Sequence, residues 1–334
     1  MFYNVKWRNY KSKSKGVLMS TIKHYHLIIN ELSGSGKGKK VSHQIGNLLM
    51  AQQISFTLHK SAYHGHTVEL TKVLAHEIEE EHNLSQSIIV IGGDGTLHEV
   101  LTGLGEQYAH IPVGYIPAGS GNDFARGTGI SKDPKKALKQ ILTAQQATKL
   151  DIIEYYDHNQ QRKGFAVNNV GIGFDAAVVK RANHSPSKVF LNKFGLSSFV
   201  YFASLIQVFF KQSAFPLTIT TNGDSTQFDD AFLVIINSHP YFGAGIPVSP
   251  KASQLDGKLD LIILPKHSFA NLLYLFVLMI FGGKHLNHKN VYYYQAPSIS
   301  LKTTSNIDSN ADGEILVDQP IDFQLKTSSR YFWI

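Results

Sequence analysis

The chain has 334 residues, of which 43% are hydrophobic and 17% charged, and its formal net charge is +7. This composition is that of a globular protein, and the length favours two domains. The chain contains no cysteine, which excludes disulfide bonds, thiol catalysis and thiolate zinc sites and favours a reducing cytoplasm.

The first twenty residues are expected to be a basic extension outside the folded domains. They contain no apolar run long enough for a secretory signal, and Met19 followed by Ser20 is the expected start of translation. The basic residues near this end are Lys6, Arg8, Lys11, Lys13 and Lys15, followed by Lys37, Lys39 and Lys40. Such clusters attract nucleotide phosphates or an anionic membrane surface, or are simply solvated. Aromatic residues are not interleaved as in a nucleic-acid platform, so no nucleic acid is expected as a partner.

The first half of the chain alternates strands with helices. Strands are predicted at 25–30, 54–59, 88–91 and 113–116, and helices at 38–50, 67–82, 97–104 and after Asp133-Pro134. This order predicts an α/β domain at 21–149, with a mostly parallel sheet whose ligands bind beyond the carboxyl ends of its strands.

The pattern changes after Lys149 to short β-rich segments. Strands are predicted at 152–156, 165–168, 217–221, 232–237, 259–264, 292–294 and 299–302, and Asn222-Gly223 predicts a hairpin turn. Two helices, 198–210 and 269–281, are apolar almost all round, which indicates burial in a core or in a pocket for acyl chains. No apolar segment is long enough to span a bilayer, and the most apolar one, 272–281, is expected to be a buried or membrane-facing helix. The region 150–321 is therefore predicted to be a β-sandwich-like domain.

Gly92-Gly93-Asp94-Gly95-Thr96 follows an apolar, β-branched strand and leads into a helix. Glycines at a strand-to-helix turn let backbone N–H groups approach a phosphate, and the helix N-terminus adds partial positive charge. Beside a phosphate chain, Asp94 suits Mg²⁺, which prefers oxygen donors. The alternative is a glycine-rich turn with a solvated Asp94.

Two further glycine loops leave predicted strands. The loop 117–126 follows the strand 113–116 and carries Ser120 as a hydrogen-bond donor and Asp123 as a second carboxylate for a metal. The loop at 30–37 resembles a P-loop but fails its pattern, because Gly38 follows Lys37 and Glu31 stands at the first glycine. The glycine spacing also fails the dinucleotide fingerprint.

These motifs together resemble the diacylglycerol kinase catalytic-domain family, and most closely its bacterial lipid kinases. The segments that carry the resemblance are 92–99, 119–124, 169–176 with Gly173-Phe174-Asp175, and Asp312-Gly313-Glu314. It extends from about residue 22 to the C-terminus. The resemblance implies an α/β nucleotide-binding domain of the NAD kinase and diacylglycerol kinase type, completed by about 322–334. A β-rich lipid-binding domain would follow, with the active site between the two, and the ATP γ-phosphate would pass to a lipid hydroxyl, most simply that of diacylglycerol.

The resemblance also implies a set of nucleotide-binding residues. By motif position these are Asn30, Glu31, Leu32, Ser33, Gly34, Ser61, Gly93, Asp94, Gly95, Thr96, Leu97, His98, Glu99 and Ser120. Ser61 takes the place of a family threonine and keeps its hydroxyl, whereas His98 stands where many relatives have asparagine. Asp94 and Asp123 would belong to the Mg²⁺ and phosphate network.

Asp312-Gly313-Glu314 matches the family's catalytic motif. A lipid alcohol is a poor nucleophile, so a carboxylate that accepts its proton is expected. On a strand, Asp312 and Glu314 would project to the same face, and Glu314 is expected to be the proton acceptor, with Asp312 as the other candidate. The alternative reading of Asn310-Ala311-Asp312-Gly313 is a plain turn.

In similar bacterial enzymes a second, structural Mg²⁺ lies in the β-rich domain. Carried over by position, its ligands are Ser253, Asp256 and the backbone carbonyl of Lys258, although Asp256-Gly257 is also an ordinary turn signal. The sixteen histidines form no recognisable metal-ligand set and are expected to be mostly on the surface.

Other functions remain open at this stage. A kinase for a sphingoid base or another lipid is one. An NAD kinase shares the Gly-Gly-Asp-Gly-Thr loop, but its Asn-Asn-Glu element appears here as Asn168-Asn169-Val170. A catalytically silent ATP-binding regulator is the third. The lipid acceptor implies peripheral contact with the anionic inner face of the membrane, and the family implies a homodimer.

Overall fold

The computed structural model describes residues 22, 24–80, 85–183, 205–243 and 245–334. The expected basic extension, its Met19 and the first part of the predicted helix 198–210 lie outside these residues. The chain forms two compact units. Unit 1 comprises the chain up to Asp151 together with Ser329–Ile334, and unit 2 comprises Ile152–Ser328.

Unit 1 is built on a parallel sheet. Its strands are β1 (His24–Ile29), β2 (Ser55–Lys60), β3 (Gln86–Gly92) and β4 (Val113–Pro117), in the order β2-β1-β3-β4. The C-terminal end of β13 (Glu314–Trp333) adds a short parallel pairing with β4. β1, β3 and β4 are buried almost throughout, as their apolar β-branched runs predict.

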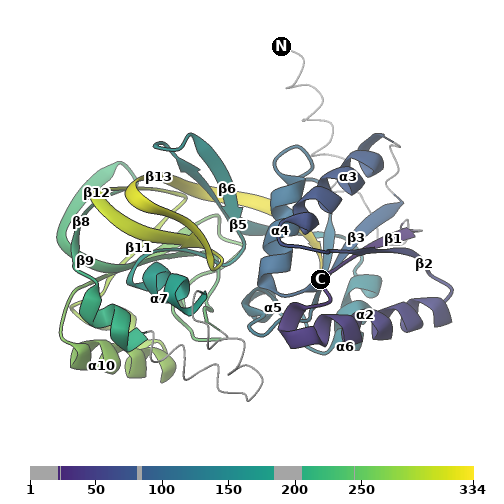
Figure 1. The fold of residues 1–334 in the computed structure, drawn as a ribbon, viewed down its shortest axis with the longest axis horizontal. Coiled ribbons are helices and arrows are strands. Elements are labelled where there is room, and N and C mark those ends of the chain that lie inside the picture. Colours follow the sequence, from purple (N-terminus) through teal and green to yellow (C-terminus); the bar gives the residue numbers. More distant parts are fainter. Residues whose placement is uncertain (1–21, 23, 81–84, 184–204, 244) are drawn as a thin grey trace, which may run out of the picture. The chain divides into compact units, whose positions relative to one another are not determined.

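Helices cover both faces of this sheet. They are α2 (Ser33–Ala51), α3 (His66–Glu80), α4 (Asp94–Leu104), α5 (Asp123–Thr128) and α6 (Pro134–Thr143). Figure 1 shows α3 and α4 on one side of the strands and α2 and α6 on the other. Asp133 caps α6 by accepting the N–H of Lys136 at 3.0 Å, as the Asp-Pro signal predicts. The α/β expectation for this half of the chain is confirmed.

The strand order fixes where a ligand can bind. β1 lies between β2 and β3. The chain passes from β1 to β2 on one side and then crosses to β3 on the other side of β1, so the strand order reverses at β1. Such a reversal point opens a crevice beyond the carboxyl ends of the strands. The loops after β1 and β3 flank this point, and the loop after β4 is next to them.

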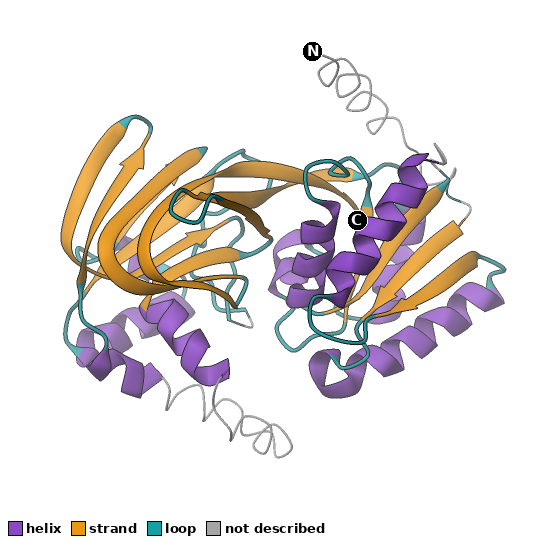
Figure 2. Ribbon diagram, turned by 45° about the horizontal axis from the view of Figure 1, so that its top comes forward, coloured by secondary structure: helices purple, strands orange, loops and turns teal. Residues whose placement is uncertain are grey.

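Unit 2 is an antiparallel β-sandwich-like domain, as predicted. Its strands are β5 (Thr148–Asp157), β6 (Arg162–Ala166), β7 (Asn169–Gly173), β8 (Phe215–Thr221), β9 (Asp224–Asn237), β10 (Leu259–Pro265), β11 (Tyr292–Ala296), β12 (Ser298–Ala311) and most of β13. Figure 2 shows these strands curving around one another. One large apolar cluster fills the domain, with Ile172, Ile219 and Val234 among its buried members. Asn222 and Gly223 both have positive φ and join β8 to β9, which confirms the predicted hairpin turn.

Short helical elements accompany the strands of unit 2 in the described part of the chain. They are α7 (Phe174–Asn183), α10 (Phe269–Ile280) and the 3₁₀ turn η2 (Lys284–Asn287), and residues 205–211 are also helical. Of the two expected positions of the segment 272–281, full burial is wrong, because Leu275 is the one fully buried side chain of α10, and the membrane-facing position stays a prediction. None of the described helices is long and apolar enough to cross a bilayer.

Candidate active site

Three loops of unit 1 meet beyond the carboxyl ends of β1, β3 and β4. The Gly93 N–H donates to Ser33 Oγ at 2.8 Å, which joins the first loop to the second. Asn30 Nδ2 donates to Thr96 Oγ1 at 3.3 Å, a second link between the same loops. Four residues predicted to bind the nucleotide therefore come together in the folded unit.

The loops approach so closely that glycine is required. A Cβ on Gly119 would lie 2.5 Å from the Cα of Gly93, and one on Gly34 would lie 2.4 Å from the carbonyl oxygen of Ala118. Gly34 also has a φ of 57°, which disfavours a side chain. A Cβ on Gly95, by contrast, would meet no atom within 4 Å. The first turn of α4 is thus open at Gly95, and no side chain caps its N-terminus. These features are those of a phosphate cradle.

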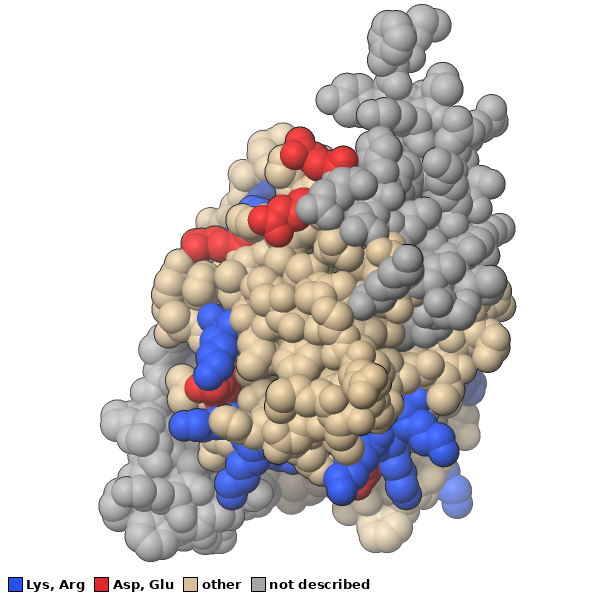
Figure 3. Space-filling model, turned by 90° about the vertical axis from the view of Figure 1, so that its right-hand side faces the viewer, with Lys and Arg blue, Asp and Glu red and all other residues tan. Residues whose placement is uncertain are grey.

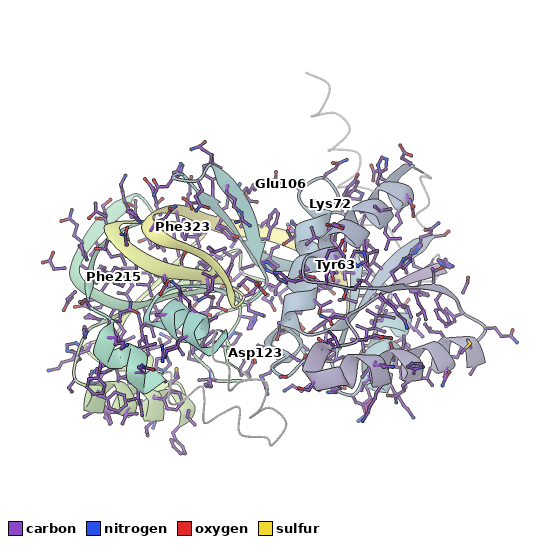
Figure 4. All side chains as sticks on the ribbon, in the orientation of Figure 1. Tyr63, Lys72, Glu106, Asp123, Phe215 and Phe323 are labelled. Atoms are coloured by element: carbon purple, nitrogen blue, oxygen red, sulfur yellow. The ribbon has the colours of Figure 1, made fainter. Side chains whose placement is uncertain are left out.

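Asp94 ties the second loop to the third. Its two carboxylate oxygens accept the N–H groups of Asp123 and Phe124, each at 3.1 Å. Tyr115 lies beneath this junction, and its hydroxyl donates toward Gly92 O at 3.3 Å. Burial raises the pKa of Tyr115 far above its ordinary value, and the charges of Asp94 and Asp123 add to the rise. The charges of both carboxylates therefore reach the same buried group, the Tyr115 hydroxyl. Asp123 is labelled in Figure 4.

The other predicted nucleotide residues have varied positions. Glu99 accepts the N–H of Gly65 at 3.0 Å and lies 3.3 Å from His64 Nδ1. Glu31 pairs with Lys60 at 2.8 Å. The N–H of Ser61 donates to Ile29 O at 2.9 Å. Leu32 and Ser120 are exposed, and His98 is half-buried on α4. Leu97 lies in the core, and its N–H donates to Gly93 O. Any ligand contact of Leu97 would therefore be indirect.

In unit 2 the Asp312-Gly313 pair forms the two-residue turn of the β12–β13 hairpin. Ala311 and Glu314 pair across the turn, and Asp312 and Gly313 have φ values of 52° and 87°. The expectation that Asp312 and Glu314 share one face of a strand is therefore wrong, because Asp312 lies in the turn itself. Glu314 begins β13 and is exposed. The turn and the catalytic-motif readings are compatible.

The Asp312 carboxylate holds a backbone segment. It accepts the N–H groups of Val167 at 2.7 Å, Asn168 at 2.8 Å and Asn169 at 3.1 Å. The Asp312 N–H in turn donates to Asn169 O at 3.0 Å. Because both of its oxygens are engaged, Asp312 fixes the chain between β6 and β7 relative to the turn that presents Glu314.

His239 extends this network and is an exception to the expectation that the histidines are mostly on the surface. It is fully buried, and His26 and His285 are buried too. The Tyr241 N–H donates to His239 Nδ1 at 3.2 Å, so Nε2 carries the proton and donates to Asn168 Oδ1 at 2.6 Å. Burial lowers the pKa of His239 to about 4, although the Asp312 charge opposes this, so the ring is neutral near pH 7.

A second polar chain reaches the turn from α7. Asn310 Oδ1 accepts the N–H of Gly313 at 3.2 Å, and its Nδ2 donates to Asp175 Oδ2 at 2.9 Å. Asp175 is buried, and burial raises its pKa to about 6 against the opposing effect of the Asn310 hydrogen bond. Asp175 belongs to the Gly173-Phe174-Asp175 motif, whose purpose the sequence alone did not reveal.

This buried carboxyl makes the stability of unit 2 depend on pH. Its pKa is raised from an ordinary value of 3.8 to about 6, so between these values the folded chain keeps a proton that the unfolded chain has lost. The free energy of unfolding should therefore fall as the pH rises through this window. In Asp175→Asn this contribution is absent. Between pH 4 and 7 the free energy of unfolding should therefore fall by about 3 kcal/mol more in the wild type than in the variant. Urea unfolding at several pH values measures this, and parallel curves would contradict it.

The proposed structural metal segment is a tight loop. Ser253 Oγ accepts the N–H of Leu255 at 3.3 Å, and Asp256 Oδ1 accepts that of Lys258 at 3.0 Å. Nearby Asp260 is fully buried, and its Oδ2 has no hydrogen-bond partner among the described residues. Burial raises the pKa of Asp260 to about 6, and the Asp256 charge adds to the rise. Hard oxygen donors beside a buried carboxylate fit Mg²⁺.

Unit 1 also carries a basic surface on α2 and α6. Its exposed members are Lys37, Lys39, Lys40, Lys135, Lys136 and Lys139. Neither helix contains an acidic residue. Figure 3 shows Lys and Arg side chains gathered along the lower part of the face in view. This surface suits an anionic partner.

Comparisons with known proteins agree with this architecture. The model of the diacylglycerol kinase catalytic domain matches residues 24–155, and that of the YegS C-terminal NAD kinase beta sandwich-like domain matches residues 168–329. A Bacillus subtilis protein named "Putative lipid kinase YtlR" is 32% identical over 91% of this chain and 97% of its own length. A Staphylococcus carnosus protein named "Putative lipid kinase" is 22% identical over 90% of this chain and 94% of its own.

A solved structure shares the fold. The crystal structure titled as a putative diacylglycerol kinase from Bacillus anthracis superposes with a TM-score of 0.72 and 23% identity. The match covers 93% of this chain and 97% of that one. That likeness concerns the fold, whereas the family follows from the two domain matches and the Bacillus subtilis relative. This chain belongs to the diacylglycerol kinase catalytic-domain family of lipid kinases.

Proposed function

We propose that the protein transfers the γ-phosphate of ATP to the hydroxyl of diacylglycerol. The observation that carries this proposal is the cradle of unit 1, in which Gly34, Gly93 and Gly119 bring three loops together beside the open N-terminus of α4. Membership of a lipid kinase family makes a lipid alcohol the expected acceptor. 1,2-Diacylglycerol presents one free primary hydroxyl to such a site.

On the donor side, the protein holds and orients the phosphates. Backbone N–H groups at the start of α4 would donate to phosphate oxygens, and the helix dipole favours negative charge there. Asp94 and Asp123 are the carboxylates that would hold Mg²⁺ beside these phosphates. When bound, this ion would neutralise charge that develops on the phosphate oxygens.

On the acceptor side, Glu314 is proposed as the proton acceptor. The lipid O–H bond breaks, its proton passes to the Glu314 carboxylate, and the oxygen forms a bond to the γ-phosphorus while ADP leaves. Asp312 is proposed to act as a positioning residue, because its oxygens hold the N–H groups of Val167, Asn168 and Asn169. The carboxylates thus divide the work: one anchors the turn, and the other takes the proton.

The partner proposed for this enzyme is the anionic surface of the membrane in which the lipid resides. The lysines of α2 and α6 have the charge for this contact. An NAD acceptor is less favoured, since Val170 stands at the place of the carboxylate in the Asn-Asn-Glu element. The peripheral location at the inner membrane face remains part of the proposal.

An acceptor assay tests the proposal. Purified protein is given γ-labelled ATP with diacylglycerol, a sphingoid base or NAD, the lipids being presented in detergent micelles. Labelled phosphatidic acid is the expected product, and formation should be at least about tenfold faster than with either other acceptor. Labelling of NAD alone would overturn the lipid assignment, and ATP binding without any transfer would identify a silent regulator.

A further inference from the structure

Helix α10 is apolar on the face that packs against the rest of unit 2. Its twelve residues, FANLLYLFVLMI, include no charged side chain. Phe269 and Leu272 pack against the cluster that contains Phe209 and Phe232, and Met279 packs against the neighbouring cluster around Ile262. This inner face is therefore the ordinary buried side of an α-helix.

The opposite face of α10 is also apolar, and it is exposed. Leu273, Tyr274, Phe276, Val277 and Ile280 follow the spacing of one helical face, and each is exposed. Phe281, just after the helix, is 73% exposed. A surface helix normally turns polar side chains outward. This outer face of α10 instead presents large hydrophobic side chains to water.

The outer face is extended by a neighbouring segment. Phe210 is 70% exposed, and its ring lies 5.8 Å from that of Phe269 at the start of α10. Figure 1 shows the helical residues before β8 beside α10. Contiguous apolar surface of this kind marks a site of interaction, whereas single exposed hydrophobic residues do not.

The chain segments that form and flank the outer face carry basic but no acidic side chains, and the acidic residues near them in space, Asp229 and Asp230 of β9, lie beside Lys266 before the start of α10. The chain contains no acidic residue from 205 to 223 or from 261 to 307. Lys211 is the last residue of the helical segment 205–211, Lys284 and Lys289 follow α10 in the chain, and all three are exposed. An apolar helix face with lysines at its ends matches the acyl and headgroup layers of an anionic bilayer, where lysine ammonium groups reach the phosphates.

We infer that the outer face of α10, together with Phe210, inserts into the interfacial layer of an anionic phospholipid bilayer. The helix would lie in the plane of the membrane, with Tyr274 at headgroup level and Phe281 among the acyl chains. This inference rests on the proposed function, because a lipid acceptor gives the enzyme a reason to engage the membrane. It adds an apolar contact from unit 2 to any electrostatic contact of α2 and α6.

Vesicle binding without catalysis tests the inference. The wild type and the double variant Tyr274→Ser/Val277→Ser are sedimented with vesicles of phosphatidylglycerol and phosphatidylcholine that contain no diacylglycerol, in the absence of ATP. The variant should bind at least about tenfold more weakly, because two large apolar contacts are lost. Val73→Ser is the matched control, since Val73 is an exposed helical valine on α3 of unit 1 (59% exposed, against 48% for Val277). It should bind like the wild type.

The readouts separate this inference from the proposed function. Vesicle binding needs no phosphoryl transfer, so it can succeed even if the acceptor is misassigned. Phosphorylation of diacylglycerol in detergent micelles can succeed even if α10 does not insert. Equal vesicle binding by the wild type and the double variant would overturn the inference. So would light scattering that shows a dimer in the wild type and a monomer in the variant without any change in vesicle binding, because a second copy would then cover this face.

Discussion

Glu314→Gln should reduce the rate of phosphoryl transfer roughly a thousandfold, the scale of a lost general base. Glutamine keeps the length of the side chain but cannot accept the proton of the attacking hydroxyl. Glu314 is exposed at the start of β13, and the Asp312-Gly313 turn before it is held by other residues. The fold and the affinity for ATP should therefore change little. Labelled phosphate transfer and calorimetric titration with a non-hydrolysable ATP analogue measure these two effects.

Asp322→Asn is the matched control for this prediction. Asp322 is another carboxylate of β13, and it pairs with Lys302 of β12 at 2.8 Å. A pair of this kind at the surface contributes little to stability, and its loss should leave transfer within about twofold of the wild type. If Glu314→Gln transferred phosphate as fast as Asp322→Asn, Glu314 would not be the proton acceptor.

The architecture of unit 1 could be predicted from the sequence because local pattern and tertiary role agree there. The runs before Asn30, Gly93 and Pro117 are apolar and β-branched, and each one is a strand of the parallel sheet. The helix predicted from residue 38 begins close to where regular helix begins in α2, although α2 as a whole starts at Ser33. Gly34, Ser35 and Gly36 have left-handed φ values, so regular helix starts only after them.

The polar networks of unit 2 could not be predicted, because they join residues far apart in the sequence. Asp312 holds N–H groups some 145 residues earlier in the chain, and Asp175 reaches Asn310 across a separation of 135. No local pattern marks His239 as a buried ring between Tyr241 and Asn168. The strand β7 was also missed, since Gly171 and Gly173 weaken its strand signal.

Helix α10 shows why an apolar pattern leaves both a buried and a membrane-facing helix open. Hydrophobicity on all sides predicts burial only if protein is the sole apolar medium available. In α10 one side packs on the sheet and the other is exposed, so a sequence pattern alone does not distinguish a core helix from a surface helix that meets another apolar phase. The glycine loops are different, because their positions after predicted parallel strands are enough to predict where a phosphate would bind.

Asp94→Asn should disable the site by loosening the loops. In the wild type one carboxylate oxygen accepts the N–H of Asp123 and the other that of Phe124. Asparagine has a single acceptor oxygen, so one of these N–H groups would face an NH₂ group. Losing a hydrogen bond to a charged acceptor should lower the free energy of unfolding by about 2 kcal/mol. Because the third loop is then no longer fixed against the second, transfer should fall at least about a hundredfold and ATP affinity about tenfold.

Asp133→Asn separates the effect on the site from a general effect on helix ends. Asp133 also accepts a backbone N–H at the start of a helix in unit 1, that of Lys136. Asparagine caps a helix almost as well as aspartate, so this control should keep its stability and its transfer rate. Urea unfolding, ATP titration and transfer assays on both variants give the comparison. If Asp94→Asn lost stability but kept ATP affinity and transfer, Asp94 would be a structural tie alone and its place beside the phosphates would have to be abandoned.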